Sequence, residues 1–154
     1  MERYTISPKQ EILLKYIAIP IEMDRYPGID PIRIMKGLFI FSQEVKKEWL
    51  KPNSLYEFMP YNYGPCSFEI YKDLRILKAL GLLLSNQVKH QNWNYYSLSK
   101  KGEILNKQIK IDSRAEKFLK EIKNFATKIQ FYLLLRAIYR EYPDYATNSV
   151  FKHQ

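Results

Sequence analysis

The chain has 154 residues and a formal net charge of +9, with an isoelectric point of about 9.5. This length fits one domain with a proper hydrophobic core, and an apolar content of 46% argues against extended disorder. The basic excess favours a polyanionic partner such as nucleic acid or an acidic membrane surface. Charge alone also fits a basic protein without such a partner.

The expected compartment follows from what the chain lacks. Its one cysteine, Cys66, excludes an intramolecular disulfide, which fits a reducing environment. The N-terminus has no apolar signal-peptide core, and no apolar run approaches the ~20 residues of a membrane span. We therefore expect a cytoplasmic protein without a membrane partner.

A first helix is expected over residues 7–19. Ser7 and Gln10 have capping-box spacing, with a proline at the first helical position between them. Proline and glycine then predict a connecting loop over residues 20–29.

A second helix is expected to begin at Asp30, which is followed by a proline, and to end near Glu48. Gly37 lies inside it and indicates close helix packing. The alternating residues 55–59 predict a short strand that ends before Pro60.

A turn and a third helix follow. Gly64 and the next proline indicate a tight turn, and Ser67 can cap a helix with its hydroxyl group. Gly81 predicts the end of this helix. The apolar residues of one helical face are Ile70, Leu74, Leu77 and Leu80.

Residues 82–88 and 93–98 are predicted to pair as a hairpin with the polar tip 89–92. A helix followed by such a hairpin has the order of a winged helix-turn-helix. We therefore expect a mainly α protein with a small β-hairpin (α+β).

Three further helices are expected in the last third of the chain. Ser99 can cap a helix over residues 100–109, and Ser113 has capping-box spacing with a glutamate. An apolar helix over residues 128–142 ends before Pro143, and a polar tail follows.

The sequence offers little catalytic chemistry. Cys66, His90 and His153 lack the spacing of zinc ligands, and a small buried residue in a turn is the favoured interpretation of the cysteine. Glycine-rich phosphate loops are absent from the sequence. We expect no enzyme, cofactor or metal.

Two carboxylates, Glu69 and Asp73, lie four residues apart on the third helix. Because Lys72 and Arg75 are adjacent, a solvated, salt-bridged face is a better explanation than acid–base catalysis.

The basic side chains suggest a nucleic-acid interface instead. In a winged helix, the helix before the hairpin enters the major groove, where its cations neutralise phosphates. Arg75 is the best candidate for base reading, since arginine can bind guanine through two hydrogen bonds. A solvated helix and a charged loop remain the alternative for each position. The candidate DNA-binding residues are Lys72, Arg75, Lys78, Asn86, Gln87, Lys89, His90, Asn92, Lys100 and Lys101.

Aromatic residues cluster around the central turn. Packing of the turn onto a small core is the favoured explanation, and stacking on single-stranded bases is the alternative. The cluster consists of Tyr56, Phe58, Tyr61, Tyr63, Phe68 and Tyr71.

Several short motifs follow one another around the central turn. Residues 58–65 read Phe-x-Pro-Tyr-x-Tyr-Gly-Pro, followed by Ile-Tyr-Lys-Asp-Leu at 70–74 and Leu-Gly-Leu-Leu at 80–83. These motifs resemble a group of small prokaryotic winged-helix proteins, the YwgA-like proteins and the Panacea-type (SocA-like) antitoxin domain. Residues 32–39 are similar to the family's apolar-Gln-Lys-apolar helix, and 142–149 to its terminal Tyr-Pro-x-x-x-x-Asn-Ser.

The resemblance covers roughly residues 30–149, with Met35 where the family usually has glutamine. It implies a winged-helix fold in a regulatory or defence-associated setting, and no catalytic residue.

We expect a double-stranded DNA-binding transcriptional regulator. The alternative is an antitoxin or adaptor that binds another protein through the same fold. A homodimer is expected through the helices that follow Ser113, since such proteins usually pair two half-sites. The expected layout is an N-terminal helix and loop (1–29), a winged helix-turn-helix core (30–102), C-terminal helices (103–149) and a tail (150–154).

Overall fold

The computed structural model describes residues 5–21, 27–147 and 149. The expected loop at 20–29 lies partly outside these residues, and the expected tail at 150–154 lies wholly outside them. The described chain is mainly helical with two small antiparallel hairpins, which agrees with the expected α+β class. The elements are α1 (Pro8–Ala18), α2 (Pro31–Glu44), η1 (Lys47–Trp49), β1 (Met59–Tyr61), β2 (Gly64–Cys66), α3 (Phe68–Ala79), β3 (Leu83–Gln87), β4 (Asn94–Leu98), α4 (Lys100–Gln108), α5 (Ser113–Lys128), α6 (Phe131–Glu141) and η2 (Pro143–Ala146).

The predicted capping box at the start of α1 is confirmed. The Ser7 hydroxyl accepts a hydrogen bond from the Gln10 backbone N–H at 3.1 Å, and the Gln10 side chain accepts one from the Ser7 N–H at 3.0 Å. These two bonds satisfy backbone donors that the first turn leaves without partners.

The start of α2 is confirmed, but its expected end is wrong. The Asp30 carboxylate caps the helix by accepting from the Arg33 N–H at 2.9 Å. The helix stops at Glu44 rather than near Glu48, because Val45 adopts an extended backbone and turns its side chain into the core.

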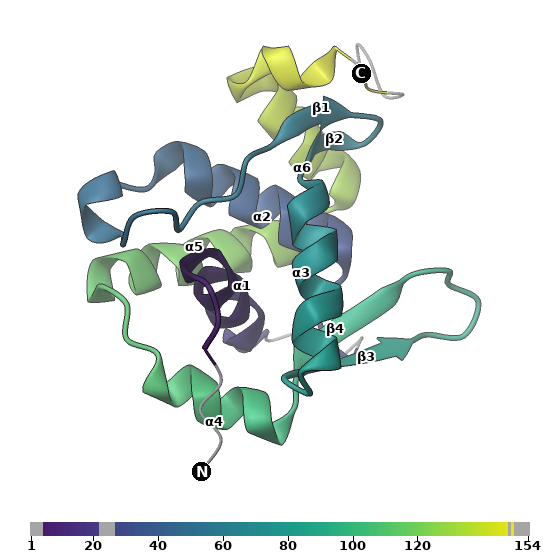
Figure 1. Ribbon diagram of the computed structural model, residues 1–154. Coiled ribbons are helices and arrows are strands. Elements are labelled where there is room, and N and C mark those ends of the chain that lie inside the picture. Colours follow the sequence, from purple (N-terminus) through teal and green to yellow (C-terminus); the bar gives the residue numbers. More distant parts are fainter. Residues whose placement is uncertain (1–4, 22–26, 148, 150–154) are drawn as a thin grey trace.

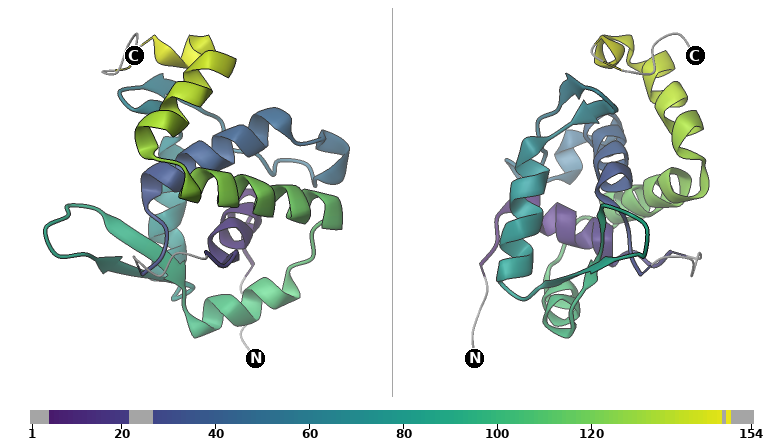
Figure 2. Two further views of the ribbon diagram at one scale, coloured as in Figure 1. Left: turned by 180° about the vertical axis from the view of Figure 1, so that it is seen from behind. Right: turned by 90° about the vertical axis from the view of Figure 1, so that its right-hand side faces the viewer.

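Close helix packing at Gly37 is confirmed. A side-chain carbon at this position would lie 1.8 Å from the hydroxyl oxygen of Tyr16, which is fully buried in α1. Figures 1 and 2 show α2 crossing behind α3 and running beside α5. The main core lies between these helices and α1.

A second, smaller core is built around Phe39 of α2. Its ring meets Phe58, Tyr142 and Tyr145 edge-to-face, with centroids 5.4, 5.1 and 4.6 Å away. Apolar side chains of α5 and α6 complete the cluster. The C-terminal helices are therefore packed onto α2 rather than attached loosely.

The expected strand at residues 55–59 is wrong. The strand β1 begins at Met59, includes Pro60, and pairs with β2 across a tight turn. Pro60 lies opposite Pro65, a position where neither backbone donates a hydrogen bond. Proline is tolerated there because the ladder does not need its missing N–H.

The third helix is confirmed, but the expected cap by the Ser67 hydroxyl is wrong. That hydroxyl is buried and has no hydrogen-bond partner among the described residues, because the Ile70 N–H binds the Ser67 carbonyl oxygen instead, at 3.2 Å. The end of α3 agrees with prediction. Gly81 has a φ of +78°, and the N–H of Leu82 reaches back to the Leu77 carbonyl at 2.9 Å, as in a Schellman motif.

The hairpin of β3 and β4 matches the predicted strands to within one residue at each end. Ile29, which precedes α2, extends this sheet. Its backbone exchanges two hydrogen bonds with Tyr96 of β4, at 3.0 and 2.8 Å. The hairpin is thus anchored at its base, and its tip projects away from the helices (Figure 1).

The start of α4 is confirmed, because the Ser99 hydroxyl accepts from the Gly102 N–H at 3.0 Å. The expected cap of α5 is wrong by one residue. Asp112 is the N-cap and accepts from the Arg114 N–H at 2.8 Å, so Ser113 becomes the first helical residue. A carboxylate is as good a cap as a hydroxyl, which explains the shift.

Candidate nucleic-acid interface

The three cations predicted on α3 share one exposed face. Lys72, Arg75 and Lys78 are spaced by three residues, so they lie along one side of a helix. The opposite side of α3 is buried in the main core through Ile70, Leu74 and Leu77. We call Lys72, Arg75 and Lys78 the cationic face.

The two acids of α3 do not pair with these cations, so the expected solvated, salt-bridged face is wrong. Glu69 forms an ion pair with Lys9 of α1 at 3.0 Å. Asp73 is 6% exposed and accepts hydrogen bonds from the Tyr56 hydroxyl at 2.8 Å and the Gln10 amide at 3.0 Å. Both carboxylates therefore interact with side chains outside α3.

The cationic face is left without intramolecular neutralisation. Within the described residues, the ion pairs join other side chains and include none of Lys72, Arg75 and Lys78. Neighbouring like charges on a helix repel each other, so an anionic ligand would relieve that repulsion.

The orientation of α3 is set at both ends. Before the helix, the buried ammonium of Lys36 donates to the Pro65 carbonyl at 2.8 Å. After the helix, the Ser99 hydroxyl donates to the Gly81 carbonyl at 2.5 Å, which ties the start of α4 to the end of α3. Seen from the side, α3 stands at the edge of the molecule (Figure 2).

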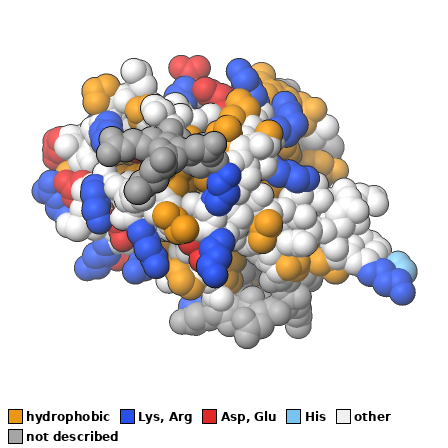
Figure 3. Space-filling view, turned by 60° about the horizontal axis from the view of Figure 1, so that its bottom comes forward, with side chains coloured by type: hydrophobic (Ala, Val, Ile, Leu, Met, Phe, Trp, Pro, Cys, Tyr) orange, Lys and Arg blue, Asp and Glu red, His pale blue; other side chains and the backbone are white. Residues whose placement is uncertain are grey.

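The predicted hairpin residues Asn86, Gln87, Lys89, His90 and Asn92 are all exposed. Figure 3 shows the hairpin projecting from a face that carries more basic than acidic side chains, with a histidine and a basic side chain at its tip. Five residues of strand separate this tip from the end of α3, a distance of about 16 Å. The tip would therefore reach a different part of a ligand than α3 does.

Not all of these residues can face the same way. Asn86 lies opposite Tyr95 and Gln87 opposite Asn94, so the two neighbouring side chains point to opposite faces of the hairpin. At most one of them lies on the side of the cationic face.

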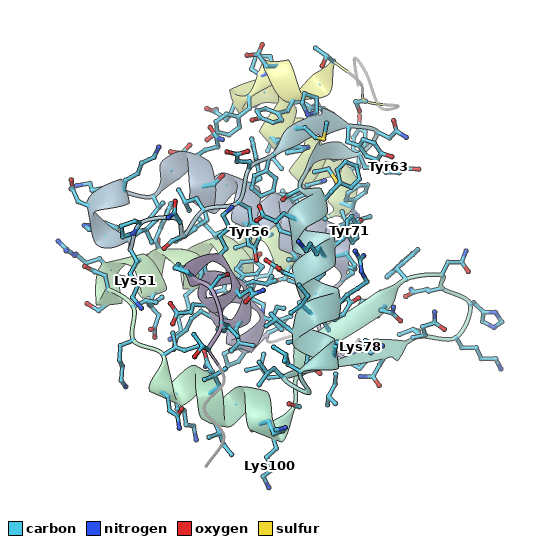
Figure 4. The ribbon with its side chains drawn as sticks, viewed as in Figure 1. Lys51, Tyr56, Tyr63, Tyr71, Lys78 and Lys100 are labelled. Atoms are coloured by element: carbon cyan, nitrogen blue, oxygen red, sulfur yellow. The ribbon has the colours of Figure 1, made fainter. Side chains whose placement is uncertain are left out.

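The two lysines at the start of α4 are also separated. Lys101 Nζ lies 3.7 Å from where a side-chain carbon of Gly81 would be, so this ammonium is beside the end of α3. Lys100 is exposed at the bottom of the molecule in Figure 4, away from the upper part of α3. Lys101 therefore extends the basic surface at the end of α3, and Lys100 lies at its edge.

Packing onto the core is the favoured prediction for the aromatic residues near α3, and the structure confirms it for only some of them. Tyr56 is 5% exposed and fulfils that prediction. It is wrong for Tyr61, Tyr63 and Phe68, which are 43%, 47% and 52% exposed. Phe68 could have been placed by helical spacing, because it shares the outer face of α3 with Lys72. The exposure of the two tyrosines follows from the β1–β2 hairpin, which sequence patterns did not reveal.

Other candidate sites have less support. Among residues 5–21, 27–147 and 149, no cluster of His, Cys, Asp and Glu side chains is suited to a metal ion. Cys66 is buried as predicted, and burial raises the pKa of its thiol, which makes it a poor nucleophile. His153 lies outside the described residues.

No protein-family model matches the chain, and no curated protein matches it. The resemblance to YwgA-like and Panacea-type proteins therefore stays a prediction. In the part of the chain that the structure describes, none of the helices is both long and apolar enough to cross a membrane.

Proposed function

We propose that the chain is a winged-helix protein that binds double-stranded DNA and regulates transcription. The cationic face of α3 carries this proposal. It presents three cations and no acid on a helix whose own carboxylates are held elsewhere.

The order of the elements supports a winged-helix fold. A first helix is followed by the extended residue Ile29, two further helices and a hairpin whose second strand pairs with Ile29. The link between α2 and α3 is much longer than the three- or four-residue turn of a simple helix-turn-helix. We treat η1 and the β1–β2 hairpin as an insertion in that turn.

In this proposal α3 lies in the major groove, with its cationic face toward the DNA. Lys72 and Lys78 contact phosphates on either side of the groove, and Arg75 between them reads a base edge. The hairpin extends along the neighbouring backbone, where Lys89 meets a further phosphate.

A homodimer through the C-terminal helices belongs to the same proposal. Phe125 of α5 and Tyr132 and Leu133 of α6 are 44%, 39% and 43% exposed, and such apolar side chains suit a subunit interface. Two copies of α3 would then meet two half-sites.

An antitoxin or adaptor that binds protein is the alternative. It would be favoured if ion pairs engaged the cations of α3 while the apolar C-terminal side stayed open. Apolar side chains of α5 and α6 are exposed, as this alternative requires. However, the cations of the cationic face form no ion pair within the described residues. The charges therefore favour DNA.

The proposal is tested by fluorescence anisotropy with labelled genomic and random-sequence duplexes. About six phosphate contacts predict a slope near −5 in a plot of log affinity against log salt. Lys72→Ala/Arg75→Ala should weaken binding, and the loss of the phosphate contact of Lys72 should make this slope less steep by about 1.

The matched control is Lys117→Ala/Lys120→Ala, which removes two exposed charges from α5. It should bind like the wild type. Absence of binding at about 50 mM salt, or equal losses in the two double variants, contradicts the proposal.

A further inference from the structure

Exposed aromatic rings extend the cationic face beyond the start of α3. Tyr61 and Tyr63 come from the β1–β2 hairpin, and Phe68 and Tyr71 come from the first turns of α3. Their exposed fractions are 43%, 47%, 52% and 37%. We call these four residues the aromatic surface. Tyr63 and Tyr71 are labelled in Figure 4, on the same side of the molecule as the projecting hairpin.

Tyr61 and Phe68 form the central part of the aromatic surface, whereas the ring of Tyr63 lies beside Phe131 of α6, with centroids 6.5 Å apart. The rings of Tyr61 and Phe68 meet edge-to-face with centroids 5.4 Å apart. Phe68 lies one helical turn before both Tyr71 and Lys72, and Arg75 follows one turn later. Rings and cations therefore form one strip along the outer side of α3, with the rings at its N-terminal end.

The strip has a single sign of charge. Glu69 lies beside Phe68 in sequence, but its carboxylate is bound to Lys9 of α1. A ligand that covers the whole strip must therefore offer negative charge next to flat apolar surface. Nucleic acid offers both, as phosphates and base faces.

A closed DNA duplex cannot offer base faces to these aromatic rings. Its bases are stacked on each other, so only their edges are accessible in the grooves. Unpaired bases expose their faces, and aromatic side chains stack on these without regard to sequence.

We propose that the aromatic surface binds unpaired bases, so that the protein prefers DNA in which a duplex opens into a single strand. This inference rests on the proposed duplex binding by the cationic face. In such a complex the cationic face holds the duplex phosphates, and the strand leaving the duplex crosses Phe68 and Tyr61. The preferred ligand is therefore a tailed or locally melted duplex.

The test compares a blunt duplex with the same duplex carrying a single-stranded oligo-dT tail, by anisotropy at fixed salt. The tail should raise the affinity of the wild type roughly ten-fold. Tyr61→Ala/Phe68→Ala should abolish this gain and leave the affinity for the blunt duplex unchanged. Both side chains are exposed, so the variant should fold, which its circular dichroism spectrum verifies.

Two comparisons separate this inference from the proposed function. Ile104→Ala removes an exposed apolar side chain, 57% accessible, from α4, outside both the aromatic surface and the proposed subunit interface, and should keep the ten-fold preference. Lys72→Ala/Arg75→Ala should weaken binding to both DNAs.

Equal wild-type affinity for blunt and tailed DNA would overturn the inference and leave duplex binding intact. So would a Tyr61→Ala/Phe68→Ala variant that loses affinity equally for both DNAs or keeps its preference for the tail. Failure of the wild type to bind either DNA would overturn the proposed function itself, and the inference with it.

Discussion

At the scale of single residues, Lys123 is the most unusual side chain in the core. It is 2% exposed, and its ammonium donates to the carbonyls of Ile17 and Ile19 at 2.9 and 2.5 Å. Its Nζ also lies 5.6 Å from the ring centre of Tyr16. No ion pair within the described residues includes it. Lys123 thus ties α5 to the end of α1, and burial lowers its pKa to about 7.

This lowered pKa makes stability depend on pH. Between pH 7 and the ordinary lysine value of 10.5, the unfolded chain holds a proton that the folded chain has released. The free energy of unfolding should therefore rise with pH in this window, by up to about 1.4 kcal/mol per unit from this group. Below pH 7 both states are protonated, and the contribution becomes constant.

Lys123→Met should remove that rise. Urea denaturation between about pH 6 and about pH 9 should show the wild type gaining stability relative to the variant as the pH increases. Lys120→Met, at an exposed position on the same helix, should keep the wild-type slope. Parallel profiles for wild type and Lys123→Met would show that Lys123 keeps its ordinary pKa in the fold.

At the scale of elements, the acidic and basic side chains of α3 lie on different sides of the helix. Its acids bind α1 and the segment before β1, and its cations face outward. The same contacts fix how the helix is rotated about its own axis. Rotation cannot bring Glu69 beside the cationic face without breaking its ion pair with Lys9 and exposing the buried Asp73.

The contact between α1 and α2 can be tested at Gly37. Alanine is the better helix former by about 1 kcal/mol, but its methyl group would overlap the Tyr16 hydroxyl. Overpacking costs up to about 3 kcal/mol, and an approach of 1.8 Å to a fully buried ring is at that upper end, so after the gain in helix propensity Gly37→Ala should lower the free energy of unfolding by about 2 kcal/mol. Gln43→Ala on the exposed side of α2 is the control and should change it by less than about 0.5 kcal/mol. A Gly37→Ala variant as stable as the wild type would mean that Tyr16 can move aside at little cost.

At the scale of the whole molecule, the open C-terminal side predicts the oligomeric state. Light scattering should give a mass of twice 18.5 kDa for the wild type. Leu133→Glu places a charge among the exposed apolar residues of α6, so the mass should fall to that of one chain. Affinity for a duplex with two half-sites should fall with it.

Ile104→Glu is the control for this variant, because Ile104 is 57% exposed on α4, outside the proposed interface. It should remain a dimer. A monomeric wild type, or equal dissociation in both variants, would contradict an interface on the C-terminal helices.

Local signals in the sequence determined most element boundaries. The caps at Ser7, Asp30 and Ser99 and the helix end at Gly81 involve partners within five residues. The shared face of Lys72, Arg75 and Lys78 also follows from spacing alone. Such features are predictable because the interacting atoms belong to one short segment.

Only the tertiary structure decided which of these groups are available to a ligand. Asp73 is buried because Gln10, 63 residues away, and Tyr56 supply its hydrogen bonds. The β1–β2 hairpin exposes Tyr61 beside Phe68, and the turn into α4 directs Lys100 away from the cationic face. Burial and pairing depend on segments that are distant in sequence. Residue patterns alone could therefore indicate the cations of α3. They could not show that no acid of α3 pairs with these cations, or that an aromatic surface lies beside them.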